Sequence, residues 1–254
     1  MLVDVHCHLD FAGLRERLDE VISNAKKAGL KSIITSGVNP ETNRIALDIA
    51  SKYKDIVNVS FGLYPIDALE REGLASKGFD VDKELEFLKK NKEMFISVGE
   101  IGLDLHSGKD LNRQKDVFFK ILDVAKKLNK PVLVHSRKAE TEALDVLKSS
   151  GVKKVIMHCF TARKNLVKKA YDEGYYFSIP PVIVRLQQFQ EMAKMIDINH
   201  IFTETDAPFL SPFKDKRNEP AFVTETIKKI AEIKGLDEKE VENNIWMNYQ
   251  KVFL

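Results

Sequence analysis

The segment Val3-Asp4-Val5-His6-Cys7-His8 lies close to the amino terminus. It predicts a strand that ends in two histidines spaced i, i+2. Because side chains alternate across a strand, His6 and His8 point to the same side, with Cα atoms about 7 Å apart. Two imidazoles at that separation can bind one ion, whereas a lone histidine in an apolar strand usually packs in the core. The pair therefore allows two interpretations, a metal site and a packed core.

Short apolar runs alternate with amphipathic segments along the whole chain. Eight runs are predicted strands: 2–6, 32–35, 57–61, 95–98, 132–135, 155–158, 175–178 and 201–204. Eight segments are predicted helices: 14–28, 41–53, 82–92, 111–128, 140–149, 162–173, 186–196 and 219–233. Eight strand–helix units in 254 residues predict an α/β fold, a (β/α)8 TIM barrel. Residues 237–252 predict an extra C-terminal helix that begins at Asp237.

The composition indicates a globular protein, with 44% hydrophobic and 31% charged residues. No linker rich in Pro, Gly or Ser interrupts it, so we expect one domain over residues 1–254. No apolar run approaches the roughly 20 residues of a membrane span. With two cysteines, Cys7 and Cys159, a disulfide scaffold is excluded and a cytoplasmic location is the default. A net charge of +2 neither demands nor excludes a polyanionic partner, and we take a monomer as the default.

Polar residues that can bind a metal follow five of the predicted strands. They are His6 and His8, Glu100, His135, His158 and Asp206. In a parallel barrel the carboxyl ends of all strands lie on one face, where barrel enzymes have their active sites. Each residue alone has an ordinary interpretation as a core, turn or capping residue. Together they predict that six side chains converge in one pocket.

Imidazole and carboxylate ligands suit Zn²⁺, Mn²⁺, Fe²⁺, Ni²⁺ or Mg²⁺. Six ligands are more than one catalytic zinc uses, so we expect two divalent ions, with zinc, magnesium or manganese as the candidates. Glu100 is the natural bridge, because it lies between the two groups in strand order. His6, His8, Glu100 and Asp206 are assigned to the first ion, and Glu100, His135 and His158 to the second.

Such a site keeps a net positive charge, which favours an anionic group such as a phosphodiester. The pKa of metal-bound water falls to about 7, which makes hydroxide available as a nucleophile. Asp206 is the candidate to take or return the proton, and with Glu100 it forms the predicted catalytic pair.

Other residues near these strand ends are less specific. Glu204 alternates with Asp206 and is a candidate to hold an imidazole or a water. Arg137 and Arg217 are candidate phosphate contacts, because one guanidinium group can donate two hydrogen bonds to the oxygens of a phosphate. Surface salt bridges are the alternative for both. Cys7 is expected to face away from the site as a buried thiol. The connections 66–79 and 208–219 are long enough to suggest function.

Several segments in order along the chain resemble the TatD family of metal-dependent deoxyribonucleases. These segments are Asp4-Val5-His6-Cys7-His8, Val98-Gly99-Glu100-Ile101-Gly102-Leu103-Asp104, Pro131-Val132-Leu133-Val134-His135-Ser136-Arg137, Met157-His158-Cys159-Phe160, Glu204-Thr205-Asp206-Ala207-Pro208 and Arg217-Asn218-Glu219-Pro220. The resemblance covers nearly the whole chain. It implies a metal-dependent barrel of the amidohydrolase kind, hydrolysis of DNA phosphodiester bonds, and the ligand assignment given above.

One position departs from the family pattern. After the third strand the family commonly has Gly-x-His-Pro, and here the sequence is Gly62-Leu63-Tyr64-Pro65. Tyr64 can donate a hydrogen bond but cannot act as an imidazole acid. The expected activity is a deoxyribonuclease acting on single strands or ends. The alternatives are a hydrolase of a small ester, amide, lactone or phosphoester, and a non-catalytic binding barrel.

Overall fold

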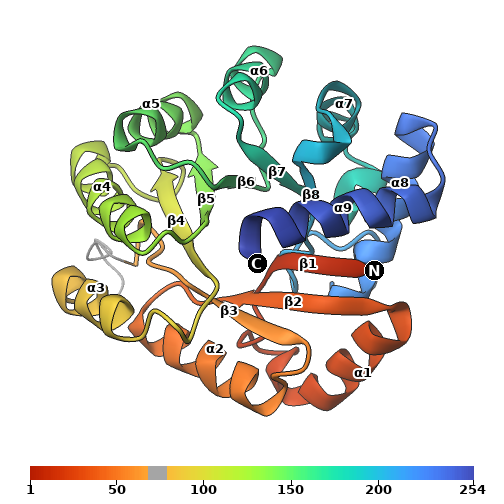
Figure 1. The fold of residues 1–254 in the computed structure, drawn as a ribbon, viewed down its shortest axis with the longest axis horizontal. Coiled ribbons are helices and arrows are strands. Elements are labelled where there is room, and N and C mark those ends of the chain that lie inside the picture. Colours follow the sequence, from red (N-terminus) through yellow and green to blue (C-terminus); the bar gives the residue numbers. More distant parts are fainter. Residues whose placement is uncertain (68–78) are drawn as a thin grey trace.

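The computed structural model describes residues 1–67 and 79–254. Its eight parallel strands form a single sheet in the order β1-β2-β3-β4-β5-β6-β7-β8, and the helices surround this sheet (Figure 1). The strands are β1 (Leu2–Cys7), β2 (Leu30–Ser36), β3 (Val57–Phe61), β4 (Ser97–Asp104), β5 (Val132–Arg137), β6 (Val155–His158), β7 (Tyr176–Ile179) and β8 (Ile201–Thr203). The predicted (β/α)8 barrel is confirmed.

The helices alternate with the strands as the sequence periodicity predicts. They are α1 (Leu18–Ala28), α2 (Pro40–Lys52), α3 (Val81–Lys90), α4 (Leu111–Lys127), α5 (Glu140–Ser150), α6 (Lys164–Asp172), α7 (Gln187–Met195), α8 (Val223–Lys234) and α9 (Glu238–Phe253). Local signals set their ends. At the start of α2, the Asn39 side chain accepts a hydrogen bond from the Thr42 N–H, and the Asn39 N–H donates to Thr42 Oγ1.

Polar contacts bring the first and last strands together, so the barrel is nearly closed. The carbonyl oxygen of His6 accepts the N–H groups of Thr205 and Asp206 at 3.3 and 2.9 Å. The buried Asp4 carboxylate accepts the hydroxyl of Thr205 at 2.5 Å and its N–H at 2.9 Å. These bonds fix the segment after β8 against β1, and therefore place Asp206 beside His6.

The predicted extra C-terminal helix is α9, which lies across β1 and β8 in Figure 1. Its Tyr249 hydroxyl hydrogen-bonds to Ser32 at 2.8 Å, and its Asn248 amide donates to the carbonyl of Ile201 at 2.9 Å. Both partners belong to the amino-terminal parts of their strands. The helix therefore covers the end of the barrel opposite the predicted site.

The main correction concerns β4, which was predicted at 95–98 and runs from Ser97 to Asp104. Glu100 therefore lies inside the strand and does not follow it. Two glycines made this segment look like a turn, but both are needed for close approach to β5. A Cβ on Gly99 would lie 2.5 Å from Leu133 Cβ, and one on Gly102 would lie 1.9 Å from the His135 carbonyl oxygen.

Smaller differences concern helix starts. The segment predicted from residue 14 begins with a short 3-10 turn, Arg15–Arg17, and the helix predicted from 219 begins at Val223 after a second such turn. Most of the long connection 66–79 falls outside the described residues.

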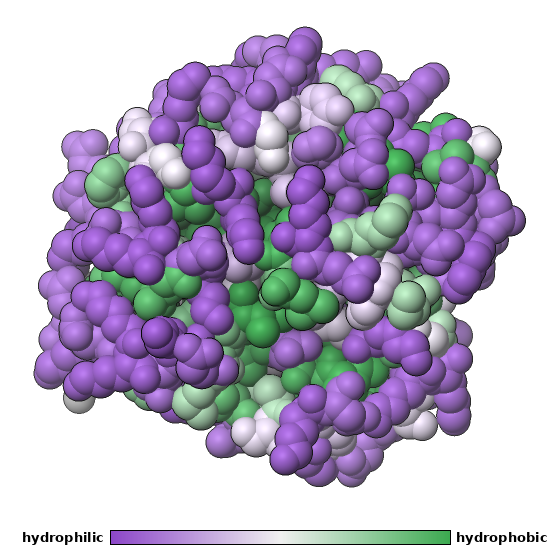
Figure 2. Space-filling model, in the orientation of Figure 1, coloured by the Kyte–Doolittle hydropathy of each residue, from purple (hydrophilic) through white to green (hydrophobic). Residues whose placement is uncertain are grey.

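The surface is mainly hydrophilic on the face shown in Figure 2, with apolar residues gathered toward its middle. Within the described chain, no helix combines the length and the apolar character that crossing a membrane requires.

Candidate metal centre

Five of the six predicted ligands lie in the carboxyl-terminal half of a barrel strand or just beyond it, and Glu100 is the fourth of the eight residues of β4. His6 is in β1 and His8 directly follows it; Glu100 is in β4 and His135 in β5. His158 ends β6, and Asp206 comes three residues after the end of β8. The strand register between β4 and β5 is irregular between Val98 and Ile101. Such irregularities re-aim side chains, and this one includes Glu100.

Glu100 lies at the centre of the cluster and faces a different pair of histidines with each oxygen. Its Oε1 is 2.9 Å from His135 Nδ1 and 3.9 Å from His158 Nε2. Its Oε2 is 3.5 Å from His8 Nε2 and 3.7 Å from His6 Nε2. Asp206 completes the cluster, since its Oδ1 lies 3.5 Å from Nε2 of both His6 and His8.

Apart from the 2.9 Å between Glu100 Oε1 and His135 Nδ1, which is the length of a hydrogen bond, these separations suit ligands that share an ion. Two atoms bound tetrahedrally to zinc at about 2.1 Å lie about 3.4 Å apart, whereas a hydrogen bond is at most about 3.2 Å long. Two groups of three residues each have ligand atoms that lie within 4.8 Å of one another. One group is His6, His8 and Asp206, and the other is His6, Glu100 and His158. His6 Nε2 is buried without a hydrogen-bond partner in the described structure. The donor set therefore fits divalent metal ions.

Hydrogen bonds to the opposite ring nitrogens aim three imidazoles at the cluster. His6 Nδ1 hydrogen-bonds to the Ser36 hydroxyl at 3.0 Å, and His8 Nδ1 hydrogen-bonds to the Ser36 carbonyl oxygen at 3.0 Å. The Nδ1 of His158 is 2.7 Å from Glu204 Oε2. Each ring is left with Nε2 facing the centre, the arrangement that such partners impose on metal-binding histidines.

His135 is turned the other way, with Nδ1 toward Glu100. Its Nε2 lies 3.2 Å from Asp104 Oδ2, and the Tyr64 hydroxyl donates to the same oxygen at 2.5 Å. Sequence reasoning gave Asp104 no role. A signal was present, because Asp104 lies four residues after Glu100, on the same side of an alternating strand, at the end of the run Val98–Asp104.

Glu204, the candidate to hold an imidazole or a water, has no exposed surface. Besides His158, its carboxylate accepts the hydroxyl of Ser178 at 2.7 Å and the N–H of Cys159 at 2.9 Å. These contacts place it beneath the cluster as the partner of an imidazole. Cys7 is also buried, and its thiol lies 3.6 Å from the Ile34 carbonyl oxygen, away from the site.

The side chains of the cluster strongly shift one another's pKa values. Burial alone would raise the pKa values of Glu100 and Asp206, but the surrounding histidines hold both well below their usual range. Burial opposes a charged His8 or His158, yet the neighbouring carboxylates raise the pKa of His8 to about 9 and that of His158 to about 10. Burial lowers the pKa of His6 to about 4. Without metal, positive charge on the histidines balances the carboxylates.

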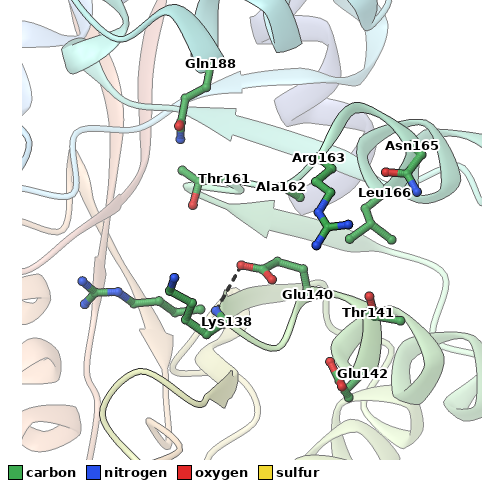
Figure 3. Close-up of a pocket in the computed structure, with 11 residues that line it drawn as sticks. Lys138, Glu140, Thr141, Glu142, Thr161, Ala162, Arg163, Asn165, Leu166 and Gln188 are labelled. Carbon is green, nitrogen blue, oxygen red and sulfur yellow. Dashed lines mark hydrogen bonds between the residues drawn. The ribbon is translucent and has the colours of Figure 1, made fainter.

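The two predicted phosphate-binding arginines lie outside the cluster. Arg137 is exposed and lines a cavity of about 590 Å³ with Lys138 and Arg163. Figure 3 shows Glu140 between Lys138 and Arg163, where its carboxylate accepts the Lys138 N–H at 3.0 Å. Arg217 is exposed too, but its Nη1 donates to the Ala12 carbonyl oxygen at 2.6 Å.

Comparison with known proteins matches the whole architecture. The family model for TatD related DNase matches residues 3–254. The chain is 33% identical to human deoxyribonuclease TATDN3 over 258 residues, covering 99% of this chain and 94% of the relative. It is 32% identical to a metal-dependent hydrolase from Methanocaldococcus jannaschii over 251 residues, covering 99% of this chain and 96% of that protein.

The fold also matches a solved structure of a TatD homologue, YjjV from Escherichia coli K12. The TM-score is 0.88 at 23% identity, and the superposition covers 99% of this chain and 97% of the other. This likeness supports the barrel and its helical arrangement.

Proposed function

The chain belongs to the TatD family of metal-dependent hydrolases, and on that premise we propose that it is a deoxyribonuclease with two divalent metal ions. The observation that carries the proposal is the position of Glu100, whose two oxygens face different histidine pairs. A carboxylate in that position is suited to bridge two ions. The substrate we propose is a single strand or a strand end of DNA.

The ligands divide naturally between two positions. His6, His8 and Asp206 would hold the first ion with Glu100 Oε2, and His135 and His158 would hold the second with Glu100 Oε1. Imidazole and carboxylate ligands are compatible with zinc, manganese or magnesium. Divalent ions in such sites lower the pKa of a bound water to about 7 and neutralise charge on phosphoryl oxygens.

The chain's own residues supply proton transfer and position. The Asp206 carboxylate is the proposed proton acceptor and donor, because it lies beside His6 and His8 and keeps 16% of its side-chain surface exposed. Tyr64 keeps its proton, since burial and the Asp104 carboxylate raise its pKa. Its hydroxyl therefore acts as a hydrogen-bond donor where the family commonly has a histidine. Arg137, exposed at the neighbouring cavity, is the proposed contact for a further phosphate.

The proposal is tested by cleavage of a labelled single-stranded oligonucleotide by protein loaded with Zn²⁺, Mn²⁺ or Mg²⁺. We expect cleavage that a chelator abolishes and that Glu100→Gln reduces at least about 100-fold, because the bridge between the ions is weakened. Glu93→Gln, at an exposed glutamate, is the matched control and should retain wild-type cleavage. Hydrolysis of small esters, amides or lactones without hydrolysis of DNA would contradict the proposal and favour the alternative substrates.

A further inference from the structure

Exposed phenylalanines lie in the two loops that carry the candidate ligands His8 and Asp206. Phe11, Phe209 and Phe213 keep 45%, 47% and 41% of their surface exposed. The remaining exposed phenylalanine of the described residues is Phe119, in α4 on the outside of the barrel. Because exposed aromatic surface is unfavourable in water, three such rings on two neighbouring loops suggest a binding role.

The backbone ties two of these rings directly to candidate ligands. The Phe11 N–H donates to the His8 carbonyl oxygen at 3.1 Å, and the Phe209 N–H donates to the Asp206 carbonyl oxygen at 2.9 Å. Each phenylalanine therefore follows a ligand by one tight turn. The rings of Phe11 and Phe209 pack edge to face with centroids 5.1 Å apart, and the Phe209 ring is 6.4 Å from the His8 ring.

Further contacts hold the two loops in place. The Arg217 guanidinium donates to the Ala12 carbonyl oxygen and lies over Gly13, where an added Cβ would be 1.8 Å from Nη1. The Asn218 amide donates to the carbonyl oxygens of Thr205 and Phe209 at 2.7 and 2.6 Å. The aromatic pair is therefore preorganised, and Arg217 acts here as a clamp between loops.

Basic residues in the loop that carries Phe209 are consistent with an anionic ligand. Lys214, Lys216 and Arg217 are exposed directly after Phe213, with Asp215 as the only acidic residue among them. Aromatic side chains interleaved with cations are the means by which proteins bind single-stranded nucleic acid without reading its sequence. A base within a duplex has both faces covered by its neighbours, whereas a base at a strand end does not.

We propose that Phe209, supported by Phe11, is a stacking platform for the nucleobase attached to the phosphodiester in the metal centre. This inference rests on the proposed deoxyribonuclease function and adds a determinant of specificity. The platform selects single strands and strand ends because only there is a base free to stack. Phe209 thus recognises the substrate without taking part in proton transfer.

The test compares binding of two non-cleavable phosphorothioate strands, one complete and one abasic at its terminal nucleotide, by fluorescence anisotropy. Stacking on an aromatic side chain corresponds to between about 5-fold and 150-fold in binding. The wild type should prefer the complete strand by that factor, and Phe209→Leu should bring the ratio close to 1. Phe209→Tyr, which keeps the ring, should retain the preference, and so should Phe119→Leu, the control at an exposed phenylalanine on α4.

Equal binding of both strands by the wild type, or an undiminished preference in Phe209→Leu, would overturn the platform. Binding is measured without turnover, so the outcome does not depend on catalysis. If the wild type shows the preference but cleaves no strand with any metal, the platform stands and the proposed nuclease function fails.

Discussion

Glu204 provides a test of the candidate metal centre, because its side chain is buried and hydrogen-bonds to only one of the six candidate ligands. In Glu204→Gln one amide oxygen replaces two carboxylate oxygens, so it can accept either the His158 Nδ1–H, as Oε2 does at 2.7 Å, or the Cys159 N–H, as Oε1 does, but not both. In either orientation His158 loses its charged hydrogen-bond partner. Partners of this kind typically contribute 10- to 100-fold to metal affinity, on the order of 1.4 to 2.8 kcal/mol. We expect the second ion to bind weaker by about that factor, with the first ion unaffected.

Isothermal titration calorimetry of metal-free protein with Zn²⁺ measures both binding steps. Ser178→Ala removes a hydroxyl that donates to the same carboxylate oxygen but keeps the carboxylate that partners His158, so it should have a smaller effect, below about tenfold. Glu225→Gln, on the surface of α8 with Lys228 as its partner, is the matched control and should behave as the wild type. Equal weakening of both steps, or no change in either, would refute the assignment of Glu204 to the second ion through His158.

Three further predictions follow from the same geometry. Metal binding should weaken as the pH falls from about 9 to 6. The pKa values of about 9 for His8 and about 10 for His158 mean that an incoming ion must displace their protons. Calorimetry in buffers of different ionisation enthalpy should detect this proton release, and pH-independent binding would contradict it. Gly102→Ala should destabilise the fold by about 1–3 kcal/mol or more, because Gly102 has φ +141° and an added Cβ would lie 1.9 Å from the His135 carbonyl oxygen. Thermal unfolding measures the loss of stability, and an unchanged Tm would contradict this close contact. Asp206→Asn should lower kcat about 100-fold or more, because its proton transfer is lost; a KM effect alone would count against that role.

The sequence predicted much of the fold because the barrel repeats one simple pattern. Apolar runs at strand length alternate with amphipathic helices, and the topology then requires that strand ends meet on one face. That rule was sufficient to bring His6 and His158 together across 152 residues, with ring centroids 3.9 Å apart. The same periodicity failed at β4, since glycines normally indicate a turn but here permit close contact with β5.

Other features depend on contacts that no local pattern encodes. Ser36 positions two histidines partly through its carbonyl oxygen, a group that every residue has. Asp104 acquires its role only because β4 and β5 lie side by side and because Tyr64 approaches from the segment after β3. The exposure of Phe11 and Phe209 was equally inaccessible, since an isolated phenylalanine in a loop is indistinguishable in sequence from a core residue.

The most direct test of the central claim is a crystal structure of the protein with Mn²⁺ or Zn²⁺, with the ions located by anomalous scattering. We expect two peaks, one bound to Oε1 and the other to Oε2 of Glu100, at about 2.0–2.2 Å. His6, His8 and Asp206 should bind one ion, and His135 and His158 the other. A single peak, or two peaks of which Glu100 contacts only one, would contradict the shared site.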